Sequence, residues 1–140
     1  MAAPWLPPGR WTPRALEIDP SNAQAFFGLG NAATTRGQFS EAVPLLQRAL
    51  ALQPACPLAD YALAHSLLGL GRVPESLAHY RRAEELAPGD VDVLHSYAGA
   101  LVYAGQPDAA LQKYRAALQL APADPALHFE VGVLLGKMGR

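Results

Sequence analysis

The sequence predicts an all-α fold, a solenoid in which antiparallel helix pairs stack one after another along the chain. The main observation is a period of 34 residues, which three residue types keep without insertion or deletion. A fixed period of this length indicates copies of one supersecondary unit, each of which buries its apolar face against its neighbours. The residues that keep the period are Pro20, Pro54, Pro88 and Pro122, Gly37, Gly71, Gly105 and Gly139, and Ala49, Ala83 and Ala117.

The period divides the chain into segments that end close to the recurrent proline. We expect residues 1–12 to form a proline-rich, disordered head and residues 13–22 to form the end of a partial repeat. Three full repeats then follow at 23–56, 57–90 and 91–124. Residues 125–140 are expected to form the first helix of a truncated fourth repeat.

Apolar residues ahead of each periodic glycine predict the first helix of each repeat. Their spacing is that of a helix with one buried face, as in Phe26, Leu29 and Ala33, and again in Leu63, Leu67 and Leu70. Glycine adopts the left-handed conformation that a tight helix end requires. We therefore expect each first helix to end at its glycine.

The second helix of each repeat is predicted between a short turn and the periodic proline. Ser40, Pro74 and Asp108 lie where it should start. Serine and aspartate cap free backbone amides, and proline loses no hydrogen bond at a first helical position. Pro44 is expected in the first turn of its helix, where the missing N–H is tolerated.

Small residues recur at two positions, where the paired helices are expected to approach most closely. A large side chain there would push the helices apart. The position in the first helix holds Gly30, Ala64, Ala98 and Gly132, and its counterpart in the second helix holds Ala42, Ser76 and Ala110.

This pattern closely resembles the tetratricopeptide repeat (TPR) family over residues 14–140. The most typical stretches are Gly-Leu-Gly-Asn-Ala at 28–32, Arg-Ala-Leu-Ala-Leu-Gln-Pro at 48–54 and Arg-Ala-Ala-Leu-Gln-Leu-Ala-Pro at 115–122. The resemblance implies a right-handed superhelix whose first helices line a concave groove. The large residue usual at the fourth position of each repeat is replaced by Asp60 and His128 in two of them, so these two are expected to pack less well.

Composition narrows the classes of function. Of the 140 residues 51% are apolar, which is enough for a buried core, and the net charge is −1. We expect no nucleic-acid partner, because no basic field is present to hold a phosphate backbone. No membrane partner is expected, because the apolar runs are shorter than a membrane span. The single cysteine and the lack of a signal-peptide pattern favour a cytoplasmic location.

No arrangement of residues is typical of an active site, so we expect no enzymatic activity, cofactor or metal. The four histidines, His65, His79, His95 and His128, lack the spacing that places two metal ligands on one helix face beside a carboxylate. Cys56 has no adjacent basic residue to activate it as a nucleophile.

The TPR resemblance implies which residues face the groove. Phe27, Tyr61, His95 and Phe129 share the fifth position of their repeats and are expected to form an aromatic row. Aromatic side chains bury much area and act as interface hot spots, although in a short array some of these residues are alternatively shielded parts of the core. The candidate groove residues are Phe27, Asn31, Tyr61, His65, Asp92, His95, Tyr103 and Phe129.

The sequence therefore predicts a non-catalytic scaffold that binds a peptide or a helix of a partner protein in the groove. The alternative is the TPR segment of a larger enzyme, such as a glycosyltransferase, whose catalytic domain is absent from this chain. Self-association is a further expectation, since a following helix would be needed to cover Val131, Leu134 and Leu135 of the last helix. The identity of the partner does not follow from the sequence.

Overall fold

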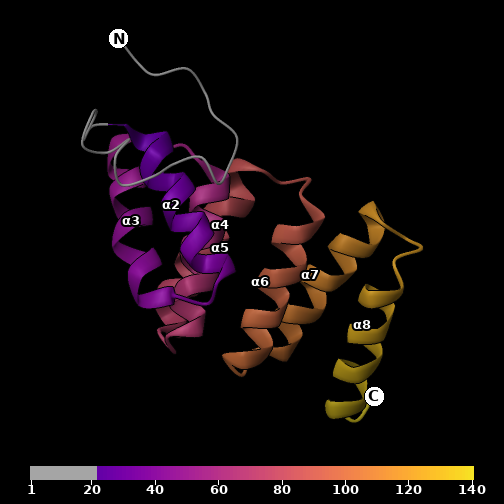
Figure 1. The fold of residues 1–140 in the computed structure, drawn as a ribbon. Coiled ribbons are helices and arrows are strands. Elements are labelled where there is room, and N and C mark those ends of the chain that lie inside the picture. The colour runs from indigo at the N-terminus through magenta and orange to yellow at the C-terminus, as the bar shows by residue number, and fades with distance from the viewer. Residues whose placement is uncertain (1–21) are drawn as a thin grey trace.

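The computed structural model describes residues 22–140, and the elements in this range are all α-helices (Figure 1). The expected head at 1–12 and nearly all of the expected partial repeat at 13–22 lie outside the described residues. The helices are α2 (Ala23–Thr35), α3 (Phe39–Leu52), α4 (Pro57–Gly69), α5 (Val73–Leu86), α6 (Val91–Tyr103), α7 (Pro107–Leu120) and α8 (Pro125–Lys137).

The helices pack as consecutive pairs, α2 with α3, α4 with α5, and α6 with α7, and α8 stands alone at the end (Figure 1). Each pair also contacts the next, because α3 packs on α4, α5 on α6 and α7 on α8. The first helices of neighbouring pairs touch as well, α2 against α4 and α4 against α6. The all-α solenoid predicted from the 34-residue period is confirmed.

The glycine-terminated helix ends are also confirmed. Gly37, Gly71, Gly105 and Gly139 all have positive φ, between 73° and 78°. The backbone N–H after each glycine donates to a carbonyl five residues back, as from Gln38 to Ala33 over 2.8 Å. This is the hydrogen-bond pattern of a Schellman motif, which satisfies carbonyls that a helix end otherwise leaves free.

The expected caps of the second helices were wrong by one residue or more. These helices begin at Phe39, Val73 and Pro107, and the preceding residue makes no side-chain capping bond in any of them. Ser40 and Asp108 lie inside the first turn instead. The reason is that the glycine turn already fixes the backbone of the residue before the helix, so no side-chain cap determines where the helix starts. Side-chain caps occur at first helices, from Asn22, Asp90 and Asp124.

Pro44 was expected in the first turn of its helix, and this was wrong because the helix begins earlier than expected. Because α3 begins at Phe39, Pro44 lies in the second turn and its missing N–H leaves the carbonyl of Ser40 without its helical donor. Pro44 and Ser40 are both exposed. Water can therefore hydrate that carbonyl, and α3 continues without a break to Leu52.

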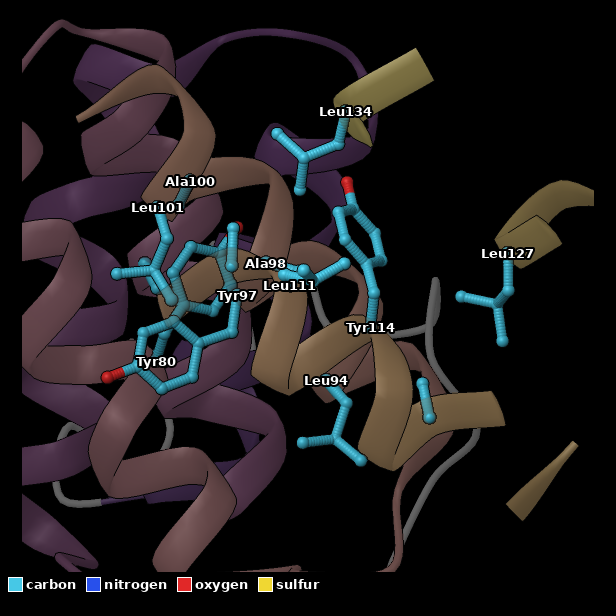
Figure 2. Close-up of a cluster of buried hydrophobic side chains, with 13 residues drawn as sticks. Tyr80, Leu94, Tyr97, Ala98, Ala100, Leu101, Leu111, Tyr114, Leu127 and Leu134 are labelled. Carbon is cyan, nitrogen blue, oxygen red and sulfur yellow. The ribbon is translucent and has the colours of Figure 1, made fainter. Parts of the chain in front are cut away.

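The core lies between the paired helices, where the small residues permit close approach. A Cβ atom added at Gly30 would lie 2.7 Å from Cγ of Leu46, so this position in α2 has no room for a side chain. Ala64 and Ser76 meet in the next pair, where the Ser76 hydroxyl donates to the Ala64 carbonyl over 2.8 Å. Figure 2 shows the larger cluster of the C-terminal half, in which the rings of Tyr80 and Tyr97 stack with centroids 5.9 Å apart.

The open end at α8 differs from the expectation in one respect. Leu134 is buried, and it lies over the side chain of Tyr114 (Figure 2). Val131 and Leu135 are half-buried against the same cluster. The uncovered part of this helix is instead the face of Gly132, where an added Cβ would meet nothing within 4 Å.

Two glycines at the same repeat position should respond in opposite ways to alanine. Gly30→Ala is expected to lower the free energy of unfolding by about 1–3 kcal/mol, because the new methyl group overlaps Leu46. Gly132→Ala should raise it by about 0.5–1 kcal/mol, since alanine is the better helix former and the site is open. Urea unfolding followed by circular dichroism measures both. Equal effects at the two sites would contradict the close approach of α2 and α3.

Replacing Pro44 should stabilise the protein. Pro44→Ala restores an N–H donor to the helix interior and should raise the free energy of unfolding by about 1–3 kcal/mol, partly offset by a more flexible unfolded chain. Pro74→Ala is the matched control, because Pro74 lies in the first turn of α5 and should change stability by less than about 0.5 kcal/mol. Urea titration of both variants tests the placement. A loss of stability in Pro44→Ala would show that the proline is favoured there.

Candidate functional site

We call the surface formed by α2, α4, α6 and α8 the first-helix face, because these are the first helices of the successive pairs. Two hydrogen bonds between side chains join its helices. Thr34 of α2 and Ser66 of α4 approach to 2.8 Å between hydroxyl oxygens, and Tyr61 of α4 and Ser96 of α6 approach to 2.9 Å. Since the Thr34 hydroxyl donates to the Gly30 carbonyl, it accepts the bond from Ser66. The N-terminal part of the face is therefore held together by polar contacts.

The four residues of the expected aromatic row lie in different environments. Phe27 is only 9% exposed and belongs to the core cluster that includes Ala62 and Leu63. Tyr61 is half-buried and packs edge-on against Tyr80, with ring centroids 6.1 Å apart. His95 is half-buried beside the ring of Tyr114, whereas Phe129 is 69% exposed. Of the four, only Phe129 presents most of its ring to solvent.

The other four candidate residues are spread over α2, α4 and α6. Asn31 is half-buried, and His65 is exposed with its ring edge against Phe39 at a centroid distance of 5.9 Å. Asp92 is exposed in the first turn of α6. Tyr103, at the last residue of α6, is 70% exposed. Two large aromatic side chains, Tyr103 and Phe129, are thus left in solvent on the two helices at the C-terminal end of the face.

A cavity of about 150 Å³, which we call the α6–α8 pocket, opens between these same two helices. Val102 of α6 and Val133 of α8 line it, with Glu130 and Lys137 of α8. Tyr114 reaches it from α7, and Figure 2 shows this side chain directed from α7 toward α8. The pocket is therefore mostly apolar, with a few polar groups from α7 and α8.

Tyr114 supplies a hydrogen-bond donor to the pocket. Its hydroxyl makes no hydrogen bond to any other described residue, and a Cβ added at Gly99 would come within 4.0 Å of it. Gly99 places no side chain over the hydroxyl, where Asn31 and His65 stand in the two preceding repeats, although Tyr114 as a whole is buried. Burial raises the pKa of Tyr114, and the carboxylate of Glu130 raises it further, so the hydroxyl stays protonated.

Sequence reasoning placed Tyr114 on the inner stripe of its helix and did not anticipate that its hydroxyl would reach the first-helix face. The available signal was the glycine at 99, which is smaller than its counterparts in the other repeats. Because Gly99 of α6 has no side chain, the hydroxyl end of Tyr114, which comes from α7, reaches the pocket.

Asp60, which was expected to pack less well, is fully buried, and its Oδ2 has no hydrogen-bond partner among the described residues. Its Oδ1 lies 2.9 Å from Nδ1 of His79 in a hydrogen bond. Arg82 Nε lies 3.3 Å from Oδ2, which is an ion-pair distance without hydrogen-bond geometry. Arg82 also donates through Nη2 to the Pro54 carbonyl over 2.8 Å. The hydrogen bond from His79 and the nearby guanidinium of Arg82 offset the cost of burying this polar side chain.

Neither a metal site nor a membrane span emerges within the described range. No three His, Cys, Asp or Glu side chains of residues 22–140 come together as metal ligands would. Among these residues, no helix has both the length and the apolar character needed to cross a bilayer.

Comparison with known proteins assigns the chain to a family. A family model described as tetratricopeptide repeat matches residues 27–91, and a second, described as TPR repeat, matches residues 98–139. The chain belongs to the tetratricopeptide repeat family, whose members are generally non-catalytic scaffolds for protein interaction. A search of curated proteins gives no significant match.

Solved structures share the fold at low sequence identity. A crystal structure of MamA superposes with a TM-score of 0.86 at 19% identity, covering 90% of this chain and 74% of that one. YrrB, described as a TPR protein with an unusual peptide-binding site, gives 0.79 at 21% identity, covering 90% and 65%. The first TPR of Spaghetti (RPAP3), bound to the HSP90 peptide SRMEEVD, gives 0.77 at 16% identity, covering 84% and 96%. At these identities the similarity shows the fold alone.

Proposed function

We propose that this TPR protein is a non-catalytic scaffold that binds an extended peptide segment of a partner protein on its first-helix face. The observation that carries the proposal is the α6–α8 pocket, flanked by the exposed rings of Tyr103 and Phe129. Large aromatic side chains left in solvent beside an apolar cavity are typical of an interface awaiting a partner.

The pocket suits one apolar side chain of the peptide. A dry cavity of about 150 Å³ can hold a molecule as large as benzene. Val102 and Val133 would contact an aliphatic group, and the Tyr114 hydroxyl can donate to a peptide carbonyl. Glu130 and Lys137, of opposite charge, would fix the direction of the peptide at the pocket rim.

The remaining candidate residues take different roles in this proposal. His65 and Asp92 are exposed and would make polar contacts, while Asn31, Tyr61 and His95 would contribute the accessible parts of half-buried side chains. Phe27 supports the face from within the core. The peptide-bound Spaghetti structure and the peptide-binding site described for YrrB support the proposal by analogy of fold. A cytoplasmic location remains part of the proposal, based on the single free cysteine.

Loss of the two exposed aromatic rings should weaken peptide binding without unfolding the protein. Peptides selected from a displayed library against the wild type would be titrated by calorimetry. Tyr103→Ala and Phe129→Ala should each cost about 1–3 kcal/mol of binding free energy, as interface aromatics commonly do. Their melting temperatures should stay close to wild type, because both side chains lie mostly in solvent.

Leu86→Ala is the matched control, because Leu86 is an exposed apolar residue at the end of α5, outside the first-helix face. It should leave the affinity unchanged. A loss of affinity in Leu86→Ala would refute binding at this face. So would an unchanged affinity in both Tyr103→Ala and Phe129→Ala.

We also propose that two copies associate through α8. The open face at Gly132 corresponds to the position at which Gly30 meets the second helix of its own pair, so a helix of another copy could occupy it. Sedimentation velocity should show mass increasing with concentration, and Gly132→Arg should abolish the increase. Gly89→Arg, which adds the same charge at an open turn position, should not. A monomer at all concentrations would disprove the association.

A further inference from the structure

A second cavity lies at the junction between the α4/α5 and α6/α7 pairs. Its volume is about 350 Å³, and it is lined by α5, the α5–α6 turn, the start of α6 and α7. We call it the junction pocket. The peptide-binding proposal does not use it, because none of its lining residues belongs to the α6–α8 pocket.

The 34-residue period identifies what occupies the corresponding place one repeat earlier. Leu94, Ala116 and Pro88 of the junction pocket correspond to Asp60, Arg82 and Pro54. At that earlier junction the guanidinium of Arg82 lies 3.3 Å from Asp60 and donates to the Pro54 carbonyl over 2.8 Å. The place that is hollow in the third pair therefore holds an arginine head group in the second.

Arginine also occupies this position in the first pair, and at the following junction a histidine at the repeat position of Leu94 contacts the proline carbonyl. Arg48, which precedes Arg82 by one period, lies with its Cζ 5.9 Å from the ring centroid of Phe26. At the following junction His128 Nε2 lies 2.7 Å from the carbonyl oxygen of Pro122, the counterpart of Pro54. Among the described residues, only the third pair has a small side chain, Ala116, where the first two have arginine.

Two hydrogen-bond acceptors at the junction pocket are left without donors. Within the described chain no donor reaches the carbonyl of Pro88, in contrast to its counterparts Pro54 and Pro122. Oε2 of Glu84 is buried and has no hydrogen-bond partner among the described residues. Pro88 is exposed, so its carbonyl is open to a donor from outside the chain. Oε2 of Glu84 is a buried acceptor, and buried acceptors are nearly always satisfied in folded proteins.

Lys113 does not satisfy these acceptors. Its Nζ lies 2.6 Å from Oε1 of Glu84 and 5.0 Å from the ring centroid of Tyr97, which holds the ammonium on one side of the carboxylate. A carboxylate has about four lone-pair sites, so Oε2 can still accept a bond while Oε1 is paired. The walls formed by Leu94 and Leu120 are apolar and suit the aliphatic stem of a long side chain.

We propose that the junction pocket binds an arginine side chain of a partner protein. The guanidinium would take the place that Arg82 fills one repeat earlier, donating to the Pro88 carbonyl and, from another nitrogen, to Glu84. Arginine fits better than lysine because its planar fork presents five donors in fixed directions, so that one head group serves two separated acceptors. The site shares no lining residue with the α6–α8 pocket.

The test uses N-acetyl-arginine methylamide as the probe, with the full chain labelled at leucine methyl groups for NMR. The methyl signals of Leu94 and Leu120 should shift saturably over the millimolar range. N-acetyl-citrulline methylamide, which has the same shape without the charge, should bind weaker by about tenfold or more, because charge-assisted hydrogen bonds are the stronger ones. Unshifted signals, or equal shifts with both probes, would overturn the proposal.

A larger side chain at Ala116 would fill the junction pocket and should prevent the probe from binding. Ala116→Arg should abolish the probe-induced shifts and raise the melting temperature, because the new side chain can bond to Pro88 as Arg82 bonds to Pro54. Gln47→Arg adds the same charge at an exposed site on α3 and should leave probe binding intact. If Ala116→Arg does not fold, Ala116→Leu fills the same volume and should also block the probe. Binding that persists in a folded filled variant would place the probe elsewhere and overturn the proposal.

Discussion

The contact between the two helices of each pair is the constraint on which the rest of the structure depends. At Gly30 the neighbouring Leu46 leaves no room for even a methyl group. In the next pair Ala64 and Ser76 are also in direct contact, through a hydrogen bond from the Ser76 hydroxyl to the Ala64 carbonyl. Leu46 fills the space that remains within its pair, so open space is left mainly between pairs. The two cavities proposed as binding sites lie at such inter-pair positions, between α6 and α8 and between α5 and α7. Close packing within pairs thus determines where hollows can form between them.

Features governed by local backbone rules were predictable from the sequence. The periodic glycines marked the ends of the first helices because only a left-handed residue closes that turn, and all four have positive φ. Ser40 and Pro44 were misplaced because the turn after Gly37, rather than a side-chain cap, determines where α3 begins. Local backbone rules therefore predicted the correct helices, but they placed the starts of the second helices slightly too late in the sequence.

Features that depend on residues distant in the sequence were not predictable. Asp60 is acceptable in the core only because His79 and Arg82 reach it from the next helix. Phe27 and Phe129 share a repeat position, yet one is buried and the other exposed, because Phe27 packs beside α4 and α8 is the last helix. The exposed fraction of a groove residue thus depends on its place in the array as well as on its place in the repeat.

The hydrogen bonds between first helices also have a mechanical consequence. Thr34 with Ser66, and Tyr61 with Ser96, cross-link α2 to α4 and α4 to α6, while no side-chain hydrogen bond between described residues links α6 to α8. A stack of similar units bends most easily at its least cross-linked joint. We expect this solenoid to behave as a stiff rod through its first three helix pairs and to flex at its last joint. The α6–α8 pocket lies in that joint, so its width would follow the bending of the molecule.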